Sequence, residues 1–280
     1  MSAGLDTLIL GSTGPIGKAT LAHFQEQGVS ACGFSRRSQP ALDIADSTEL
    51  ESVMNAFKPR TIIFLVTPPA HTLESSAVVE KFTTSLESVI SAAGSVGVQR
   101  FLVSSSAAVY GTTQTPLALT ETAQLQGASP YARLKQNVEK ILERAAPYTA
   151  MTFATLRIFN VYGEGANDSL VNKLSGAGST PVWDTQFFAR DYIRVDEVGR
   201  ALFLAAQQDG FMPTVMNIGS GYLVSNRDLI ERLPSPATID RLEYTADPSY
   251  SLADVELAAS ILGFRSCSDV LADLASAQTF

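Results

Sequence analysis

The residues whose types and spacing could do chemistry lie in two stretches, one ending a strand and one starting a helix. The apolar run that ends at Val103 is followed by three consecutive hydroxyl residues, Ser104-Ser105-Ser106. Tyr131 and Lys135 come directly after Ser129-Pro130, a pair typical of a helix N-terminus. Residues four apart share a helix face, so the phenol and the ammonium point into the same space. A nearby cation lowers the tyrosine pKa, which makes the phenol a usable acid/base near neutral pH.

Each of these two signals also has a plain structural explanation. Serines at a strand end are ordinary turn residues, and a tyrosine and lysine four apart often share an exposed helix face by chance. They become specific in combination, because the serines end a strand in a chain that also opens with a glycine-rich turn. The combination predicts a serine that hydrogen-bonds a reacting oxygen and a tyrosine that exchanges a proton with it.

The glycine-rich turn, between the first predicted strand and the first predicted helix, reads Gly11-Ser12-Thr13-Gly14-Pro15-Ile16-Gly17. Glycines there permit a tight turn and let backbone N–H groups approach a pyrophosphate at a helix N-terminus. The spacing is G-x-x-G-x-x-G rather than G-x-G-x-x-G, and a simple strand-to-helix turn is the alternative explanation. Its place directly after the first strand favours a dinucleotide-binding turn.

The end of the second predicted strand, Gly33-Phe34-Ser35-Arg36-Arg37, indicates which dinucleotide is bound. An NAD site places a carboxylate there for the ribose 2′-hydroxyl, whereas an arginine accommodates the 2′-phosphate of NADP. No acid follows until Asp43, so Ser35 and the two arginines favour NADP, with NAD as the alternative. A solvated basic turn would also explain the arginines. Asp43-Ile44 could flank the adenine, although a helix-capping loop explains them equally well.

Apolar runs alternate with helix-length segments through the first half of the chain. Strands are predicted at 7–10, 31–34, 61–66, 99–103 and 152–158, and helices at 17–24, 47–57, 74–93 and 130–144. This alternation predicts the α/β class, a Rossmann-type doubly wound parallel sheet with right-handed crossovers. After Asn160 the regularity fades. We expect a dinucleotide-binding domain of residues 1–160 plus about 190–218, and a smaller C-terminal substrate-binding region of residues 161–189 plus about 219–280.

The composition excludes several classes of function. The 280 residues carry a net charge of −8, which disfavours a nucleic-acid partner. No window is long and apolar enough to span a bilayer, and the start, Met1 to Asp6, lacks the pattern of a signal peptide. Cys32 and Cys267 have no Cys or His nearby at ligand spacing, so we expect neither a disulfide framework nor a metal site. These features predict a soluble, cytoplasmic protein with no membrane partner.

The chain resembles the extended short-chain dehydrogenases/reductases, the NAD(P)-dependent sugar epimerase/dehydratase family that includes UDP-galactose epimerase. The resemblance covers nearly the whole chain and rests on separated motifs that occur in the family's order. These are Gly11–Gly17, Ser104–Gly111, Tyr131 with Lys135, Leu156–Gly163, Arg190–Asp196, Asn217–Gly221, and Leu252–Asp254 followed by Leu262–Phe264.

The resemblance implies a role for each candidate residue. Tyr131 would give or take the proton of a sugar hydroxyl, and Ser106, which stands 25 residues before it as in the epimerases, would hydrogen-bond the same oxygen. Lys135 would hold the nicotinamide ribose and lower the pKa of Tyr131. Asn160 and Arg190 would contact a nucleotide-linked sugar substrate, Arg190 through the diphosphate. Further cofactor contacts are expected from Val66, Thr67 and Pro68.

Departures from the family narrow the reaction. Members that eliminate water carry Asp-Glu after the active-site Ser or Thr, and members that epimerise beside a ketone carry a Cys; this chain has Ala107-Ala108 there. Of the family's reactions, the one that remains is hydride transfer to or from a carbon that bears one oxygen. Because Arg36 and Arg37 stand where the NAD-retaining epimerases have an acid, we expect an NADP(H)-dependent reductase of a keto group. A nucleotide-sugar epimerase and a non-catalytic NADP sensor are the alternatives.

The predicted substrate-binding region is shorter than in the family that the chain resembles. Asn160 and Arg190 are only 30 residues apart, and the arginine that usually precedes Leu-Ala-Asp in the family is absent, so a different carbonyl substrate remains an alternative.

By analogy with the family we expect a homodimer through the helix at 74–93 and the helix that carries Tyr131 and Lys135. An apolar stripe on the first of them is formed by Val78, Val79, Phe82, Leu86, Val89 and Ile90. The alternative is that this stripe only covers the sheet.

Overall fold

Six parallel strands form the main sheet of the protein. The structure is a computed structural model that describes residues 6–176, 180–233 and 239–276. The strand order is β2-β1-β3-β4-β5-β9. The bounds are Thr7–Leu10 (β1), Ala31–Phe34 (β2), Thr61–Phe64 (β3), Arg100–Ser106 (β4), Thr152–Ile158 (β5) and Val215–Ile218 (β9). The chain places β2 on one side of β1 and β3 on the other, so the order reverses between β1 and β3, where ligands bind in such sheets.

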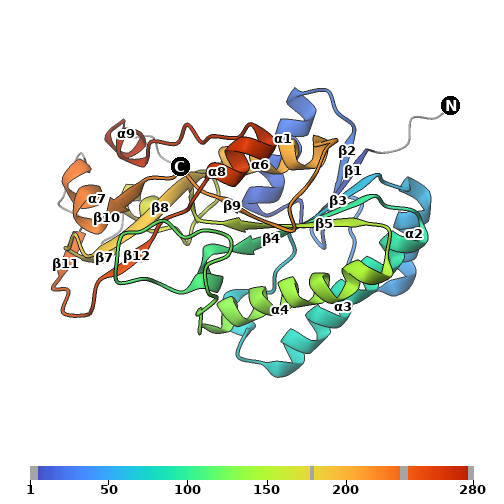
Figure 1. Cartoon of the computed structure of the whole chain (residues 1–280), viewed down its shortest axis with the longest axis horizontal. Coiled ribbons are helices and arrows are strands. Elements are labelled where there is room, and N and C mark those ends of the chain that lie inside the picture. The colour runs from blue at the N-terminus through green and yellow to red at the C-terminus, as the bar shows by residue number, and fades with distance from the viewer. Residues whose placement is uncertain (1–5, 177–179, 234–238, 277–280) are drawn as a thin grey trace.

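Helices cover both faces of this sheet (Figure 1). One face carries α1 (Pro15–Glu26), α6 (Val195–Gln207) and α8 (Glu256–Leu262). The other carries α2 (Ser47–Phe57), α3 (Ser76–Ser95) and α4 (Pro130–Ala145). The predicted α/β fold, a doubly wound parallel sheet, is confirmed. The N-cap of α2 is Asp46, whose side chain accepts from the Glu49 N–H, and the helix has the predicted bounds.

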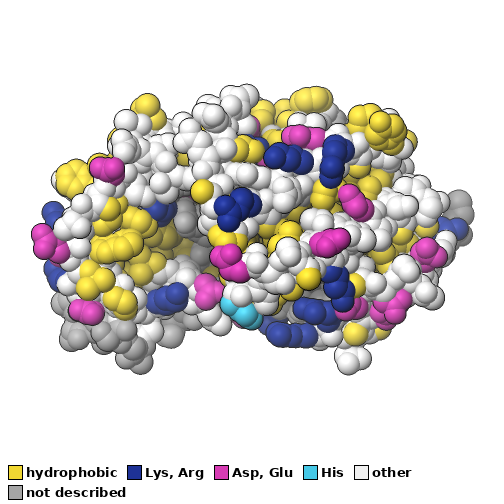
Figure 2. Space-filling model, turned by 90° about the horizontal axis from the view of Figure 1, so that it is seen from below, with side chains coloured by type: hydrophobic (Ala, Val, Ile, Leu, Met, Phe, Trp, Pro, Cys, Tyr) yellow, Lys and Arg dark blue, Asp and Glu magenta, His cyan; other side chains and the backbone are white. Residues whose placement is uncertain are grey.

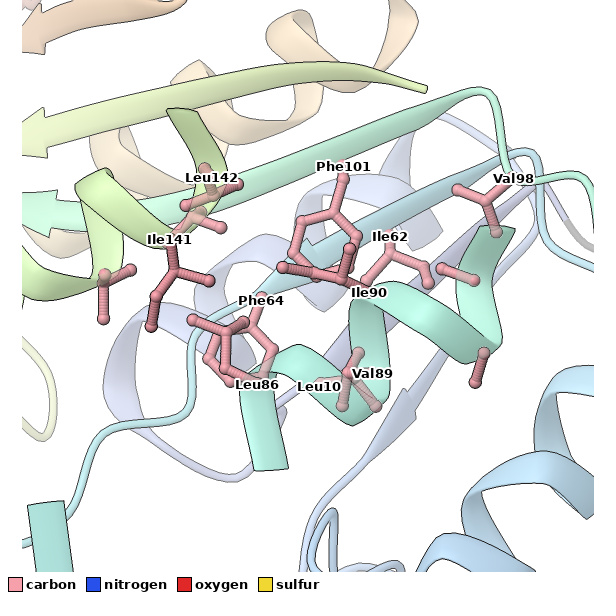
Figure 3. Close-up of a cluster of buried hydrophobic side chains, with 14 of the residues drawn as sticks. Leu10, Ile62, Phe64, Leu86, Val89, Ile90, Val98, Phe101, Ile141 and Leu142 are labelled. Carbon is pink, nitrogen blue, oxygen red and sulfur yellow. The ribbon is translucent and has the colours of Figure 1, made fainter. Parts of the chain in front are cut away.

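The two cores on either side of the sheet follow from the strand sequences. Each strand is apolar on both faces, as expected when helices cover both, so Leu10 points to the α3 side and Ile9 to the α1 side. Figure 3 shows the α3 side, where strand and helix side chains interdigitate. The labelled residues there are Leu10, Ile62, Phe64, Leu86, Val89, Ile90, Val98, Phe101, Ile141 and Leu142.

Most of the apolar stripe of α3 is buried in this core. Phe82, Leu86, Val89 and Ile90 are each less than 9% exposed and pack against the strands within one chain. The outward faces of α3 and α4 are polar instead. Figure 2, which views the molecule from the side on which α3 lies, shows basic and acidic side chains interspersed there. The apolar stripe of α3 therefore packs against the sheet, which was the alternative to a dimer contact. The homodimer stays a prediction, and the stripe does not support it.

A smaller region is built around β8 (Phe188–Arg194), at the left of Figure 1. β8 pairs with β10 (Leu223–Ser225), β12 (Ser249–Ser251) and β6 (Asn160–Tyr162). A separate two-stranded sheet joins β7 (Thr180–Trp183) to β11 (Ile239–Leu242). Among its described residues are the short helices α5 (Leu170–Ser175), α7 (Asn226–Arg232) and α9 (Val270–Ala275). The predicted domain boundaries stay a prediction, and their ranges include residues outside those described.

Among the described residues, no helix is long and apolar enough to cross a membrane. Three 3-10 turns, Ala70–Thr72, Ala107–Tyr110 and Ala146–Tyr148, lie between the longer elements. The turn Ala107–Tyr110 directly follows β4 and leads into an irregular connection that runs to α4. This connection and the ends of β4 and α4 border the candidate site.

Candidate active site

A cavity of about 800 Å³ opens at the carboxyl ends of the parallel strands. The predicted turn of β1, the serines of β4, the start of α4 and the substrate residues all line it. From the sequence predictions these are Gly11, Gly14, Pro15, Ile16, Gly17, Thr67, Ser106, Tyr131, Lys135, Asn160 and Arg190. Side chains from well-separated parts of the chain thus converge at the place where parallel-sheet proteins bind ligands.

The glycine-rich turn requires glycine at two positions. Gly11 has a φ of +93°, and a Cβ there would lie 3.0 Å from the carbonyl carbon of Leu65. A Cβ on Gly17 would lie 2.4 Å from the Gly11 oxygen. Helix α1 begins at Pro15 with Gly14 as its N-cap, and no side chain caps it. The backbone N–H groups of its first turn can therefore bind an anion, which fits the diphosphate of a dinucleotide.

The groove continues into a second cavity of about 660 Å³ that shares Gly11, Gly14, Leu65 and Thr67 with the first. The predicted adenosine-side residues line it: Thr13, Ser35, Arg36, Arg37, Asp43, Ile44, Val66 and Pro68. Ser12 lines neither cavity; it is 6% exposed, and its Cβ would lie 2.5 Å from a Cβ added to Gly33. The two connected cavities, with the glycine-rich turn where they meet, fit a nicotinamide dinucleotide.

The Ser35 hydroxyl lies at the centre of the adenosine-side turn. It is 2.9 Å from the Thr13 hydroxyl and accepts a hydrogen bond from the Arg37 N–H at 3.0 Å. The side chains of Arg36 and Arg37 are exposed and make no hydrogen bond or ion pair with any described residue. Their guanidinium groups are therefore available to an anionic ligand at this end of the groove.

Each of the three serines of β4 is paired with one residue of α4. The Ser106 and Tyr131 side chains lie beside each other at the cavity, and the Ser104 carbonyl accepts from Lys135 Nζ at 2.8 Å. The Ser105 hydroxyl donates to the Glu139 carboxylate. The three α4 residues are spaced by four and so lie along one helix face. Ser104 and Ser105 therefore lie inside the strand and contact the helix, whereas Ser106 ends the strand and also caps the 3-10 turn, since its hydroxyl accepts from the Ala108 N–H at 3.2 Å.

Burial shifts the pKa values of both Lys135 and Tyr131. Lys135 is 3% exposed, and its burial lowers its pKa to about 8, against the smaller opposing effect of Glu139. Burial raises the pKa of Tyr131, and the Ser106 hydrogen bond only partly offsets this. The prediction that Lys135 lowers the Tyr131 pKa is not met in this structure. The reason is that Lys135 Nζ bonds Thr67 Oγ1 at 3.0 Å and Ser104, and lies 5.7 Å from the centre of the Tyr131 ring.

The substrate end of the cavity contains both predicted residues. Asn160 donates from Nδ2 to the Asp191 carbonyl at 2.9 Å. Arg190 packs its guanidinium 3.8 Å from the centre of the Phe188 ring and donates to the Ser249 carbonyl at 2.7 Å. These contacts hold each side chain at the cavity wall.

Sequence reasoning missed several residues of the site. Thr112, Gln126 and Ser251 line the cavity from loops and a short strand whose positions no local pattern indicated. Asp191 is fully buried and accepts from the backbone N–H groups of Ser220, Gly221 and Ala253. Glu139 carried a usable signal, since it follows Lys135 by four residues on the same face of a helix. Among the described residues, no group of three or more His, Cys, Asp or Glu side chains could hold a metal ion.

Comparison with curated proteins finds UDP-glucose 4-epimerases. That of Lactobacillus helveticus is 28% identical over 213 residues, which are 65% of this chain and 63% of that protein. That of Rhizobium leguminosarum bv. trifolii is 29% identical over 175 residues, 58% of this chain and 53% of that protein. The matched part therefore spans less than two thirds of the length of these curated relatives.

Comparison with solved structures extends the similarity over nearly the whole chain. MoeE5 in complex with UDP-glucose and NAD superposes with a TM-score of 0.82 at 25% identity, covering 96% of both chains. The UDP-glucose 4-epimerase from Brucella ovis in complex with NAD gives a TM-score of 0.85 at 23% identity, again over 96% of both. The model of one family, described as the NAD dependent epimerase/dehydratase family, matches residues 7–219. With most of its length in that match, the chain belongs to the NAD-dependent epimerase/dehydratase family of enzymes.

Proposed function

We propose that this protein epimerises a nucleotide-linked sugar at a carbon bearing a hydroxyl group, by oxidising and then re-reducing that carbon with a nicotinamide dinucleotide. The observation that carries the proposal is the convergence of Ser106, Tyr131 and Lys135 in a cavity continuous with the glycine-rich turn. Family membership supports it, as do the UDP-glucose 4-epimerases among the relatives and the UDP-glucose and NAD in the MoeE5 complex. This favours the epimerase alternative over the reductase that the sequence led us to expect.

The chemistry divides among three side chains. A nicotinamide dinucleotide bound along the glycine-rich turn would supply the hydride chemistry: removal of hydride from the sugar carbon and its return to the opposite face of that carbon. The Tyr131 oxygen takes the proton of the sugar hydroxyl during oxidation and returns it during reduction. The Ser106 hydroxyl, which lies beside Tyr131 at the cavity wall, can share a hydrogen bond with the same sugar oxygen. Lys135 Nζ, held by the Thr67 hydroxyl and the Ser104 carbonyl, would bind the nicotinamide ribose.

The cavity wall supports a reaction without elimination of water. Ala107 and Ala108 line it directly after Ser106, where the dehydratases of the family carry an acidic pair. Methyl groups at these positions can neither protonate a leaving hydroxyl nor remove a proton from carbon. The residues that can move a proton here are therefore those around Tyr131, which fits epimerisation or simple reduction.

A reductase of a keto sugar with NADPH is the second candidate, favoured by one observation. Arg36 and Arg37 line the adenosine-side cavity without partners among the described residues, so they can bind a 2′-phosphate. The NAD in the MoeE5 and Brucella ovis complexes favours NAD instead. The cofactor preference thus distinguishes the two candidates.

The first experiment measures epimerisation directly. Purified protein is incubated with UDP-glucose or UDP-galactose, and with their N-acetylated forms, and the products are resolved by NMR. We expect interconversion of at least one pair, absent in Tyr131→Phe. If instead keto-sugar nucleotides consume NADPH while no pair interconverts, the reductase is correct. If no substrate turns over although cofactor binds, the protein is a dinucleotide sensor.

The second experiment measures cofactor preference by competition between NADP and NAD. If the arginines select the cofactor, the wild type binds NADP more tightly, and Arg36→Asp with Arg37→Ala reverses the preference. A matched control is Arg133→Ala, which removes an exposed arginine outside both cavities. Tighter binding of NAD by the wild type would reject the NADP preference and strengthen the epimerase proposal.

A further inference from the structure

A second buried polar cluster lies directly behind Lys135, and the proposed chemistry does not use it. Glu139 of α4 and Arg157 of β5 are each 4% exposed. Arg157 donates from Nη2 and Nε to the two carboxylate oxygens of Glu139 at 2.7 and 3.1 Å. Ser105 of β4 donates its hydroxyl to the same carboxylate. The cluster thus joins the helix that carries Tyr131 and Lys135 to two strands of the sheet.

The cluster continues beyond Arg157 into the connection before α4. Arg157 Nη1 donates to the Tyr110 hydroxyl and to the Glu121 carbonyl, both at 2.9 Å. The Tyr110 hydroxyl donates in turn to Asn217 Oδ1 at 2.7 Å. The guanidinium also lies 4.8 Å from the centre of the Tyr110 ring. Four separate elements are therefore held to α4 through one buried arginine.

We propose that Glu139, held by Arg157 and Ser105, is a positioning residue that fixes the Tyr131–Lys135 face of α4 against β4 and supplies the negative charge faced by the buried Lys135 ammonium. The proposal rests on the proposed function, because it assigns the two residues their part in proton transfer. Tyr131, Lys135 and Glu139 lie at successive four-residue steps and contact three consecutive serines. A shift of the helix along β4 would break all three contacts at once.

The electrostatic part follows from what surrounds Lys135. The groups bonded to its Nζ, the Thr67 hydroxyl and the Ser104 carbonyl, are neutral. On α4 it has the titratable neighbours Tyr131 and Glu139, and across the sheet the guanidinium of Arg157 is paired with Glu139. Burial lowers the pKa of Lys135, and Glu139 raises it. Without Glu139 the ammonium would therefore lose its proton at a still lower pH.

Stability alone does not explain a pair of this kind. A buried ion pair is costly to desolvate, and its replacement by uncharged residues of similar volume is often neutral or stabilising. Removal of one partner leaves the other charge buried and unpaired, which is strongly destabilising. The informative variant therefore changes both residues, Glu139→Gln with Arg157→Met, and the single variant Glu139→Gln is compared with it.

The test is an NMR titration of Lys135 and Tyr131 in protein with selectively ¹³C-labelled lysine and tyrosine, assigned through Lys135→Arg and Tyr131→Phe. It needs no turnover. In the double variant we expect the pKa of Lys135 to fall by about one unit. With an epimerisable substrate, kcat should fall roughly 10- to 100-fold at nearly constant KM, and the alkaline limb of the pH profile should move down with the Lys135 pKa. The single variant should shift the Lys135 pKa further, since Arg157 is then unpaired.

A matched control is Glu197→Gln, which breaks another largely buried ion pair, with Arg200, on the opposite face of the sheet. It should leave the Lys135 titration unchanged. A folded double variant with wild-type Lys135 titration and wild-type kcat would show that the cluster is purely structural and overturn the proposal. If the wild type turns over no substrate, the proposed function fails, while a shifted Lys135 titration would still support the electrostatic role of Glu139.

Discussion

The two ends of the 800 Å³ cavity are built in different ways. At the chemical end, Lys135 is buried and, from a sixteen-residue helix, reaches partners in the loop after β3 and on β4. At the substrate end, Asn160 and Arg190 are only partly buried and come from short strands, and Arg190 is held through backbone carbonyls and an aromatic ring. The first end is fixed by the central fold, and the second by a small region with short elements.

This difference separates catalysis from specificity. Parallel strands and long helices place side chains with little freedom, which proton transfer needs. Loops and short strands tolerate change, which a substrate site uses. At the end of the molecule formed by the smaller region, Figure 2 shows hydrophobic side chains gathered at the surface, and Trp183, Phe187 and Leu242 are 43%, 48% and 40% exposed. Variants at the chemical end should therefore change kcat, and variants at the substrate end should change KM.

The largest effect is expected from Tyr131→Phe, which removes the proton that is transferred. The kcat should fall roughly 10²- to 10⁴-fold, the usual range for general acid–base catalysis. Cofactor affinity, measured by fluorescence titration, should be unchanged, because the phenyl ring keeps its place. A variant that loses cofactor binding together with activity would show that Tyr131 acts mainly as a cofactor contact.

The second effect is a pH dependence set by Lys135. Since its pKa in the folded protein is about 8, activity should fall as pH rises above 8, about tenfold per unit for a single titrating group. Its pKa is lower in the folded chain than its ordinary value of 10.5, so the unfolded chain binds more protons between these values. Folding stability should therefore rise with pH from about 8 to 10.5, and this rise should disappear in Lys135→Met when unfolding is followed by denaturant titration.

At the substrate end, Arg190→Gln should raise KM while kcat changes little. The loss of a charged contact to a diphosphate is worth roughly 1.5–3 kcal/mol, or about 10- to 100-fold in KM. Steady-state kinetics with the sugar nucleotide measure both constants. A fall in kcat as large as the rise in KM would mean that the two ends of the cavity do not act separately.

A smaller effect is expected from Ser105→Ala, and it should appear in stability. The variant removes one hydrogen bond to the buried Glu139 carboxylate, which costs about 1–2 kcal/mol. Ser106→Ala should instead lower kcat, because this residue lines the cavity beside Tyr131; it also removes the hydrogen bond that the Ser106 hydroxyl accepts from the Ala108 N–H, so a small loss of stability is expected as well. Thermal unfolding and kinetics of both variants make the comparison. If Ser105→Ala lowers kcat as much as Ser106→Ala at unchanged stability, the assignment of Ser106 is wrong.

The smallest effect is expected from Ser104→Ala. Lys135 bonds the Ser104 backbone carbonyl, which alanine retains. Both kcat and the unfolding midpoint should stay closer to the wild type than in the other two serine variants. A large loss in Ser104→Ala would show that its hydroxyl, and not only its carbonyl, takes part in the site.

The sequence predicted most of the main sheet, though not β9, because apolar runs mark its strands and the helices between them have their own periodicity. The strands at 7–10, 31–34 and 152–158 were predicted with the bounds that the structure has. The residues around Tyr131 and the glycine turn were predictable because their spacing along one element fixes their position. Thr112, Gln126 and Ser251 were not, since their place in the cavity depends on contacts between distant segments. The direction of the Tyr131 pKa shift also escaped prediction, because it is set by burial, which no local sequence pattern shows.

The three contacts between β4 and α4 have a consequence for how such a protein can diversify. Because side chains set the register of these elements, the exposed part of their connection, residues 112–118, does not have to do so. Gly127 is the fixed point near its end, since a Cβ there would lie 2.1 Å from the Ala108 carbonyl oxygen. Within residues 112–118, Thr113 is paired through its backbone with Tyr250, so segments of other lengths can be grafted between Thr113 and Leu119 while the contacts between β4 and α4 are kept.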